Sequence, residues 1–152
     1  MKPQVIGKAI HKSIENQTYS DTLNILMDFA VYVEKYKLFG ITDIFDIKKG
    51  LLIERKRRIA RIYDGYVFQV YAHYFGLCEL GYKVNEIRLY DFSANKKYPI
   101  ALPQDDLKLF KKFENLIRRI NNYNMNDSKF QVKIEKCTNC IYSNLCDKAA
   151  LC

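Results

Sequence analysis

Hydrophobic and polar positions follow two rhythms along this chain, and stretches of one rhythm are interleaved with stretches of the other. Runs rich in β-branched and aromatic residues are typical of strands. They cover residues 26–33, 36–47, 51–58, 84–92 and 98–102. Apolar residues that recur every three or four positions are typical of amphipathic helices. They cover residues 4–16, residues 64–80 and a third stretch from Pro103 through Ile120. The pattern therefore predicts an α/β fold in which a mixed sheet is flanked by helices.

Turn-forming residues separate these elements. Lys48–Gly50 is expected to connect the second and third strands, and Asn95–Lys97 the last two. Gly81 follows the second helix, at the position where glycine often ends a helix in the left-handed conformation. Pro103 stands at the predicted start of the third helix, with two aspartates in the first turn, where acidic side chains suit the helix dipole.

The composition adds a strong positive charge. The 152 residues include 25 Lys and Arg against 17 Asp and Glu, which gives a formal net charge of +8. This balance favours a polyanionic partner, with nucleic acid ahead of an anionic membrane surface. At this length we expect one main domain, residues 1–135, and a small cysteine-rich appendage, residues 136–152.

The same sequence argues against a membrane or secreted protein. No stretch approaches the ~20 consecutive apolar residues of a membrane span. Residues 1–15 lack the continuous apolar segment of a secretion signal. We therefore expect a cytoplasmic protein with reduced thiols and without a membrane partner.

Two acids and a lysine form the first candidate site. Glu54 and Lys56 are two residues apart on the third predicted strand, so their side chains share one face. The tight turn before this strand can bring Asp43 of the second strand alongside them. The carboxylates could bind Mg²⁺ or Mn²⁺, and the lysine could orient a water for attack on a phosphodiester. The alternative is a surface ion pair on a solvated strand edge, which would contribute little.

Basic residues are concentrated directly after Glu54. Such a cluster suits the phosphate backbone of a nucleic acid, although some of its members must be merely solvated. The candidate DNA-binding residues are Arg55, Arg57, Arg58 and Arg61.

Five short motifs, in this order along the whole chain, resemble those of RecB-like nucleases of the PD-(D/E)XK superfamily. They are Gly7–His11, Gly40–Asp43, Glu54–Lys56, Gln69 and the cysteine pattern of the C-terminal tail. The cysteines narrow the resemblance to the Cas-four family of CRISPR-associated exonucleases, and residues 63–69 and 95–98 are most similar to the form found in type V systems.

The resemblance implies a restriction-endonuclease-like core and a Mg²⁺- or Mn²⁺-dependent exonuclease acting on single-stranded DNA or DNA overhangs. Such an enzyme would trim prespacer ends during CRISPR adaptation, with the CRISPR integrase complex as its partner. The rival interpretation is a subunit of that complex that binds or measures prespacer DNA without catalysis and carries a zinc or Fe–S knuckle.

The resemblance also implies roles for single residues. His11, Asp43 and Glu54 would bind the metal, assisted by the backbone carbonyl of Arg55. Lys56 would be the catalytic lysine, and Gln69 would position either this lysine or the substrate. The family usually has a tyrosine four residues after the glutamine. That position is His73 here, flanked by Tyr71 and Tyr74, so the tyrosine role is assigned to none of the three.

The C-terminal tail holds a second candidate site. Cys137, Cys140 and Cys146 form a compact set that, in a cytosolic protein, indicates zinc or Fe–S ligation rather than disulfides. The family resemblance favours a [4Fe–4S] cluster. The family's fourth cysteine usually precedes the first helix, where this sequence has none. We therefore expect an N-terminally shortened chain, the alternative fourth ligand being Cys152. Cys78 is predicted to be a small buried residue.

Overall fold

A computed structural model of the protein describes residues 24–124, 134–138, 140 and 142–146. The chain forms two compact units, residues 1–117 and 118–152, and each is described by itself. The first unit contains a five-stranded sheet and its helices. The elements are β1 Ile25–Val33, β2 Leu38–Asp46, β3 Leu51–Lys56, α2 Asp64–Glu79, β4 Glu86–Asp91, β5 Lys96–Ile100 and α3 Leu107–Asn121, which extends into the second unit.

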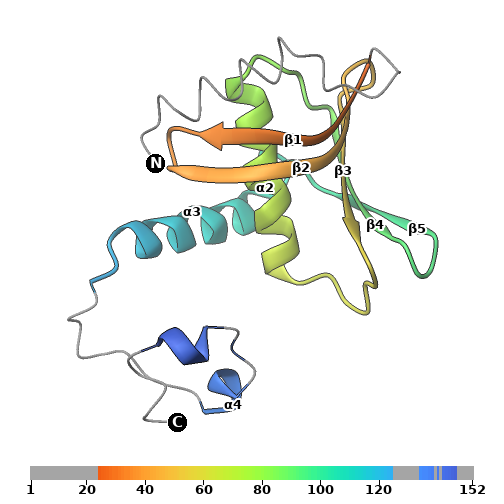
Figure 1. Ribbon diagram of the computed structural model, residues 1–152. Coiled ribbons are helices and arrows are strands. Elements are labelled where there is room, and N and C mark those ends of the chain that lie inside the picture. The colour runs from red at the N-terminus through yellow and green to blue at the C-terminus, as the bar shows by residue number, and fades with distance from the viewer. Residues whose placement is uncertain (1–23, 125–133, 139, 141, 147–152) are drawn as a thin grey trace. The chain divides into compact units, whose positions relative to one another are not determined.

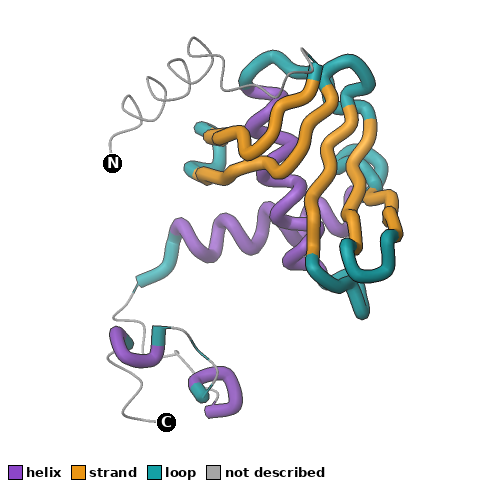
Figure 2. The backbone as a smooth tube through the Cα atoms, turned by 45° about the vertical axis from the view of Figure 1, so that its right-hand side comes forward, coloured by secondary structure: helices purple, strands orange, loops and turns teal. Residues whose placement is uncertain are grey.

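The strands lie in the sheet in sequence order, from β1 to β5. β1, β2 and β3 form an antiparallel meander, and β5 pairs antiparallel with β4. β3 and β4 are parallel because α2 carries the chain back between them. Figures 1 and 2 show α2 and α3 on the same side of this sheet. The expected α/β architecture with a mixed sheet is therefore confirmed. The predicted helix at residues 4–16 lies outside the described residues.

The core lies between the sheet and α2. Leu52, Ile87 and Leu89 of the central strands are fully buried, as are Val70 and Leu77 of the helix. Phe113 of α3 completes a cluster of aromatic rings that includes both edge-to-face and stacked pairs. The other members of this cluster are Tyr36, Phe68, Tyr71, Phe75 and Phe110. This packing fixes the position of α2 over the strands.

The helix ends explain one correct prediction and one error. Gly81 has φ +87°, and its N–H and that of Tyr82 bond back to the carbonyls of Cys78 and Leu77, so the predicted glycine stop of α2 is confirmed. The third helix begins at Leu107 rather than at Pro103. Asp106 lies before its first turn, where the carboxylate accepts the Leu109 N–H at 2.9 Å and caps the helix.

The turn before β5 also differs from the expectation. The predicted Asn95–Lys97 turn is wrong because β5 already begins at Lys96, which pairs with Asp91. Asn95 takes the left-handed conformation, with φ +50°, which asparagine tolerates better than most residues. This single backbone reversal closes the turn two residues earlier than a count of polar residues suggests.

Asp91, at the end of β4, fastens two loops together. The carboxylate is buried and accepts the Ile59 N–H at 2.8 Å from the loop after β3. Its other oxygen accepts the Ala94 N–H at 3.0 Å from the turn before β5. These backbone bonds lower the pKa of Asp91, with a smaller contribution from Arg58. A charged clamp thus holds the 57–63 loop against the β4–β5 turn.

We predict that Asp91 makes stability depend on pH. Because folding lowers its pKa, its contribution is present above about pH 4 and is lost as the pH falls through the lower folded value. Wild type should therefore be more stable than Asp91→Asn at pH 7, and urea unfolding should show the two converging as the pH drops below about 4. A stability difference that stays constant across this range would contradict the clamp.

The described part of the second unit contains two short helices, α4 Ile134–Cys137 and η1 Ser143–Leu145. The cysteine-rich appendage that the sequence predicts falls within this unit. None of the helices in the described residues has both the length and the apolar character needed to cross a membrane.

Candidate active site

The structure brings together three of the residues singled out in the sequence, Glu54, Lys56 and Gln69. Glu54 and Lys56 share the face of β3 that packs toward α2, from which Gln69 reaches down. The Lys56 ammonium donates to Glu54 Oε1 at 3.0 Å and to Gln69 Oε1 at 2.6 Å. The Gln69 amide in turn donates to Glu54 Oε1 at 2.7 Å. The three side chains therefore form a closed ring of hydrogen bonds.

Glu54 is charged although it is almost completely buried. Its exposed fraction is 3%, and the burial by itself raises the pKa of the carboxyl group. The nearby His73 imidazole and the Lys56 ammonium more than offset this, so the pKa of Glu54 is lowered overall. A buried carboxylate held ionised by a lysine is unlike the exposed surface ion pair that was the alternative interpretation.

His73 is the site residue whose part the sequence left open. Its Nδ1 lies 3.4 Å from Glu54 Oε2, outside hydrogen-bond geometry, and neither buried atom has another partner among the described residues. Gly40 of β2 makes room for the ring, since a Cβ at Gly40 would lie 2.8 Å from the imidazole. The signal in the sequence is the spacing, because residues four apart on a helix share a face.

The two neighbouring tyrosines point elsewhere. The Tyr71 hydroxyl donates to the Ala101 carbonyl at 3.1 Å, and burial raises the pKa of Tyr71 to about 12. The Tyr74 hydroxyl lies 3.4 Å from the Gln104 side-chain oxygen. Among these three residues of α2, His73 is therefore the one that faces Glu54.

Asp43 reaches β3 through an irregularity shared by β1 and β2. The β1–β2 pairing passes from Met27–Ile44 directly to Phe29–Thr42, and it skips Asp43 and Asp28, which has φ +48°. At this point both strands change the face that they bury. The pairing of β2 with β3 ends at Ile44 and Ile53, and beyond it the Asp43 carboxylate accepts the Arg55 N–H at 2.6 Å. Asp43 thus replaces a strand carbonyl and lies next to the backbone that follows Glu54.

The donor atoms of Asp43 and Glu54 fit a hard divalent cation, because Mg²⁺ and Mn²⁺ prefer carboxylate oxygens. The buried Glu54 Oε2 has no hydrogen-bond partner in the described part of the chain, and the His73 Nδ1 lies 3.4 Å from it. His11, the third predicted ligand, lies outside the described residues. Within the described ranges no group of three potential ligands gathers. Of the three predicted ligands, Asp43 and Glu54 lie within the described residues, and the metal site stays a prediction.

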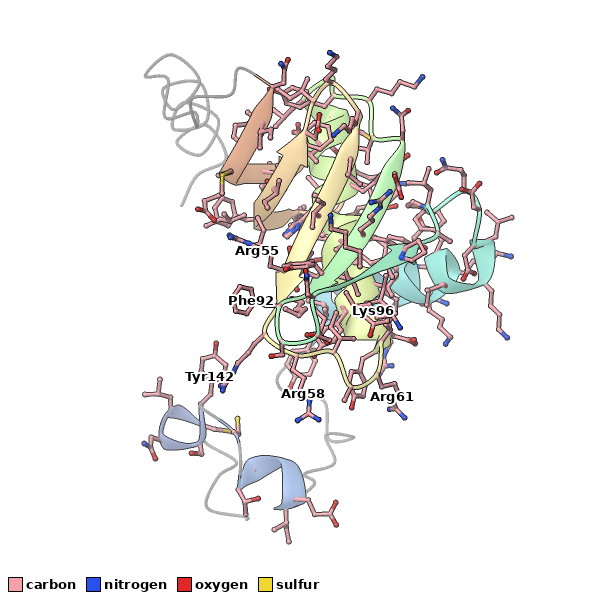
Figure 3. All side chains as sticks on the ribbon, turned by 90° about the vertical axis from the view of Figure 1, so that its right-hand side faces the viewer. Arg55, Arg58, Arg61, Phe92, Lys96 and Tyr142 are labelled. Carbon is pink, nitrogen blue, oxygen red and sulfur yellow. The ribbon has the colours of Figure 1, made fainter. Side chains whose placement is uncertain are left out.

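The candidate DNA-binding arginines divide into two groups. Arg55 is on β3 and lies 3.8 Å from Asp43 Oδ2 and 3.7 Å from Asp28 Oδ1. The other three, Arg57, Arg58 and Arg61, are exposed on the loop that follows β3. Arg61 stacks on the Tyr63 ring at 4.5 Å. The basic residues thus lie at the end of β3 that carries Lys56 (Figure 3).

The cysteines of the tail do not form a shared site in the described residues. Cys137 is half-buried, Cys140 and Cys146 are exposed, and all three are free thiols. No group of potential metal ligands forms around them in residues 134–138, 140 and 142–146, and Cys152 lies outside the described residues. Cys78 is half-buried against the core, and burial raises the pKa of its thiol.

Comparisons with known proteins add little to this geometry. No family model matches the chain, and no curated protein matches it. Among solved structures, one described as the crystal structure of SSO0001 is similar with a TM-score of 0.48 and 17% sequence identity. The likeness covers 95% of this chain and 69% of that one. At this level of similarity it carries no inference about function.

Proposed function

We propose that this protein is a metal-dependent exonuclease that hydrolyses single-stranded DNA. The observation that carries the proposal is the hydrogen-bonded ring of Lys56 and Gln69 around the buried Glu54, near Asp43 and next to a strongly basic loop. Burying a carboxylate and an ammonium costs free energy, which a purely structural position could avoid with apolar residues. A charged ring retained at the rim of a basic surface is typical of a catalytic site.

Each residue of the ring has a separate task in the proposed reaction. Water attacks the phosphorus, the bond to the leaving nucleotide oxygen breaks, and a proton is transferred to that oxygen. Lys56 supplies a positive charge and a hydrogen-bond donor for the attacking water or a phosphate oxygen. Gln69 fixes the Lys56 ammonium through its 2.6 Å hydrogen bond. The His73 imidazole lies 3.4 Å from Glu54 Oε2, the buried carboxylate oxygen outside the hydrogen-bonded ring, and limits its movement.

Asp43 and Glu54 would hold the divalent ion, together with His11. When bound, Mg²⁺ or Mn²⁺ supplies Lewis acidity and neutralises negative charge at the phosphate. The two carboxylates would hold the ion in place, and the Lys56 ammonium balances the charge of Glu54. Arg55, Arg57, Arg58 and Arg61 would bind the DNA backbone.

The resemblance of the motifs to the Cas-four family extends the proposal to a biological role. In this role the enzyme trims prespacer ends for the CRISPR integrase complex. Cys137, Cys140 and Cys146 would be three ligands of a [4Fe–4S] cluster. Their thiols are the donor atoms that such a cluster requires, but no step of the reaction passes through it.

The proposal is tested with labelled single-stranded DNA, Mn²⁺ and the purified protein. We expect release of nucleotides that EDTA abolishes. Lys56→Gln should reduce the rate by about 10²–10³-fold, the usual loss when one hydrogen-bond donor that stabilises the transition state is removed. Lys49→Gln is the matched control, because Lys49 also pairs with an acid but is exposed at the opposite end of β3. Equal activity of both variants would contradict the site, and an inactive wild type that binds DNA would favour the non-catalytic binding subunit.

A further inference from the structure

The turn after β4 and the loop after β3 form one rigid rim beside Lys56. The Phe92 N–H donates to the Lys56 carbonyl at 2.9 Å. The Ser93 N–H and hydroxyl both donate to the Arg57 carbonyl, at 3.0 and 2.6 Å. Together with the Asp91 clamp, these bonds fix the backbone of the turn to the strand that carries the catalytic lysine.

The side chains at this place are one aromatic ring and four cations, and we call the surface that they form the β3–β4 rim. It consists of Arg55, Arg58, Arg61, Phe92 and Lys96, all labelled in Figure 3. Phe92 is 72% exposed, although a large apolar side chain gains nothing from water contact. Arg58, Arg61 and Lys96 form no ion pair with an acid within 4.0 Å among the described residues.

A single exposed phenylalanine is ordinary on a protein surface. Phe92 differs from that case in two respects. Its backbone is held by the hydrogen bond to the Lys56 carbonyl, and the loop bonded to its turn carries the exposed Arg57, Arg58 and Arg61. An exposed aromatic ring beside cations is an arrangement with which proteins bind single-stranded nucleic acid, because bases stack on the ring while the cations contact phosphates.

We propose that the β3–β4 rim binds single-stranded DNA and that Phe92 stacks on an unpaired base next to the scissile phosphate. This inference rests on the proposed function and names how the substrate is held there. Because a duplex keeps its bases stacked internally, the ring would favour single strands and overhangs over blunt duplex ends. Arg58, Arg61 and Lys96 would contact phosphates on either side of the stacked base.

The chain contains no tryptophan, which allows a direct test of stacking. Phe92→Trp introduces a single fluorophore at the rim, and oligothymidylate should quench its emission in a salt-dependent way. Ile47→Trp is the control, because Ile47 is also partly exposed but follows β2 at the opposite end of β3. Its emission should stay unchanged. Quenching of both variants, or of neither while DNA still binds, would overturn the inference.

Affinity measurements separate stacking from charge. Fluorescence anisotropy with labelled oligothymidylate should show about a tenfold or larger loss of affinity for Phe92→Ala, with the salt dependence unchanged. Phe92→Leu keeps an apolar side chain but removes the aromatic face, so it should resemble Phe92→Ala. Full affinity of Phe92→Leu would overturn the stacking role. Equal quenching of Phe92→Trp by anionic lipid vesicles would indicate a membrane surface and would overturn the inference.

The same measurements distinguish this inference from the proposed activity. Quenching in Phe92→Trp without any nucleotide release by the wild type would contradict the proposed exonuclease activity and support DNA binding at the rim. Nucleotide release by the wild type without quenching in Phe92→Trp would support the exonuclease activity and contradict DNA binding at the rim.

Discussion

Glu54→Gln is expected to abolish Mn²⁺-dependent hydrolysis of single-stranded DNA, with a loss of about a thousandfold or more. The change removes the negative charge that would hold the ion, and such an ion supplies several kcal/mol of stabilisation to the transition state. It also removes the ion pair that holds Lys56 at 3.0 Å. The measurement is the single-turnover rate on a 5′- or 3′-labelled strand.

Glu86→Gln is the matched control for this variant. Glu86 lies on the neighbouring strand β4 and pairs with Arg88 two residues later, the same spacing as Glu54 and Lys56. The Glu86 and Arg88 side chains are 43% and 34% exposed, so their pair contributes little. We expect the rate of Glu86→Gln to equal that of wild type. Thermal unfolding of both variants shows whether each is folded, and a folded Glu54→Gln with full activity would disprove the site.

Gly76→Ala is expected to cause the largest loss of stability, about 1–3 kcal/mol. A Cβ at Gly76 would lie 2.6 Å from Val31 Cβ and 2.9 Å from its Cγ2, so α2 would have to move away from β1. Both positions are in the packed core, where neither backbone can move without disturbing its neighbours. Helix propensity alone would favour alanine by about 1 kcal/mol, so a net loss can only come from overpacking.

Gly65→Ala controls for the change of residue type in the same helix. A Cβ at Gly65 would meet nothing within 4 Å, so this variant should gain up to about 1 kcal/mol in urea unfolding. The double variant Gly76→Ala/Val31→Ala should lose less unfolding free energy than the sum of the two single losses. The smaller side chain at position 31 makes room for the new methyl group, which in turn fills part of the space left by the valine. If Gly76→Ala is as stable as wild type, α2 does not approach β1 as closely as described.

Much of the fold could be predicted because local pattern and tertiary packing agree. The strand that carries Glu54 and Lys56 was predicted within two residues of its observed end, and α2 within one. The errors lie where side chains reorganise the backbone. Asp106 caps α3, which begins four residues after the predicted start, and Asn95 closes the β4–β5 turn early. Both depend on particular hydrogen bonds or a left-handed residue, which a count of polar positions does not contain.

The candidate site shows the same division. The spacing of Glu54 and Lys56 alone places both side chains on one face, because alternate residues of a strand always share a face. Gln69 could be placed nearby only through the motif order, and the part of His73 was left unassigned. His73 faces Glu54 because Gly40, on a different strand, leaves space for its ring.

By itself, the sequence determined the α/β architecture, the net charge of +8 and the shared face of the acid and the lysine. These follow from periodicity and composition, which are local or additive properties. Only the tertiary structure decided that Glu54 is buried and still charged, that Asp43 bonds to the Arg55 backbone, and that the Phe92 N–H donates to the Lys56 carbonyl. Each of these depends on residues far apart in the chain, whose distances are set by how β2, β3, α2 and β4 pack together.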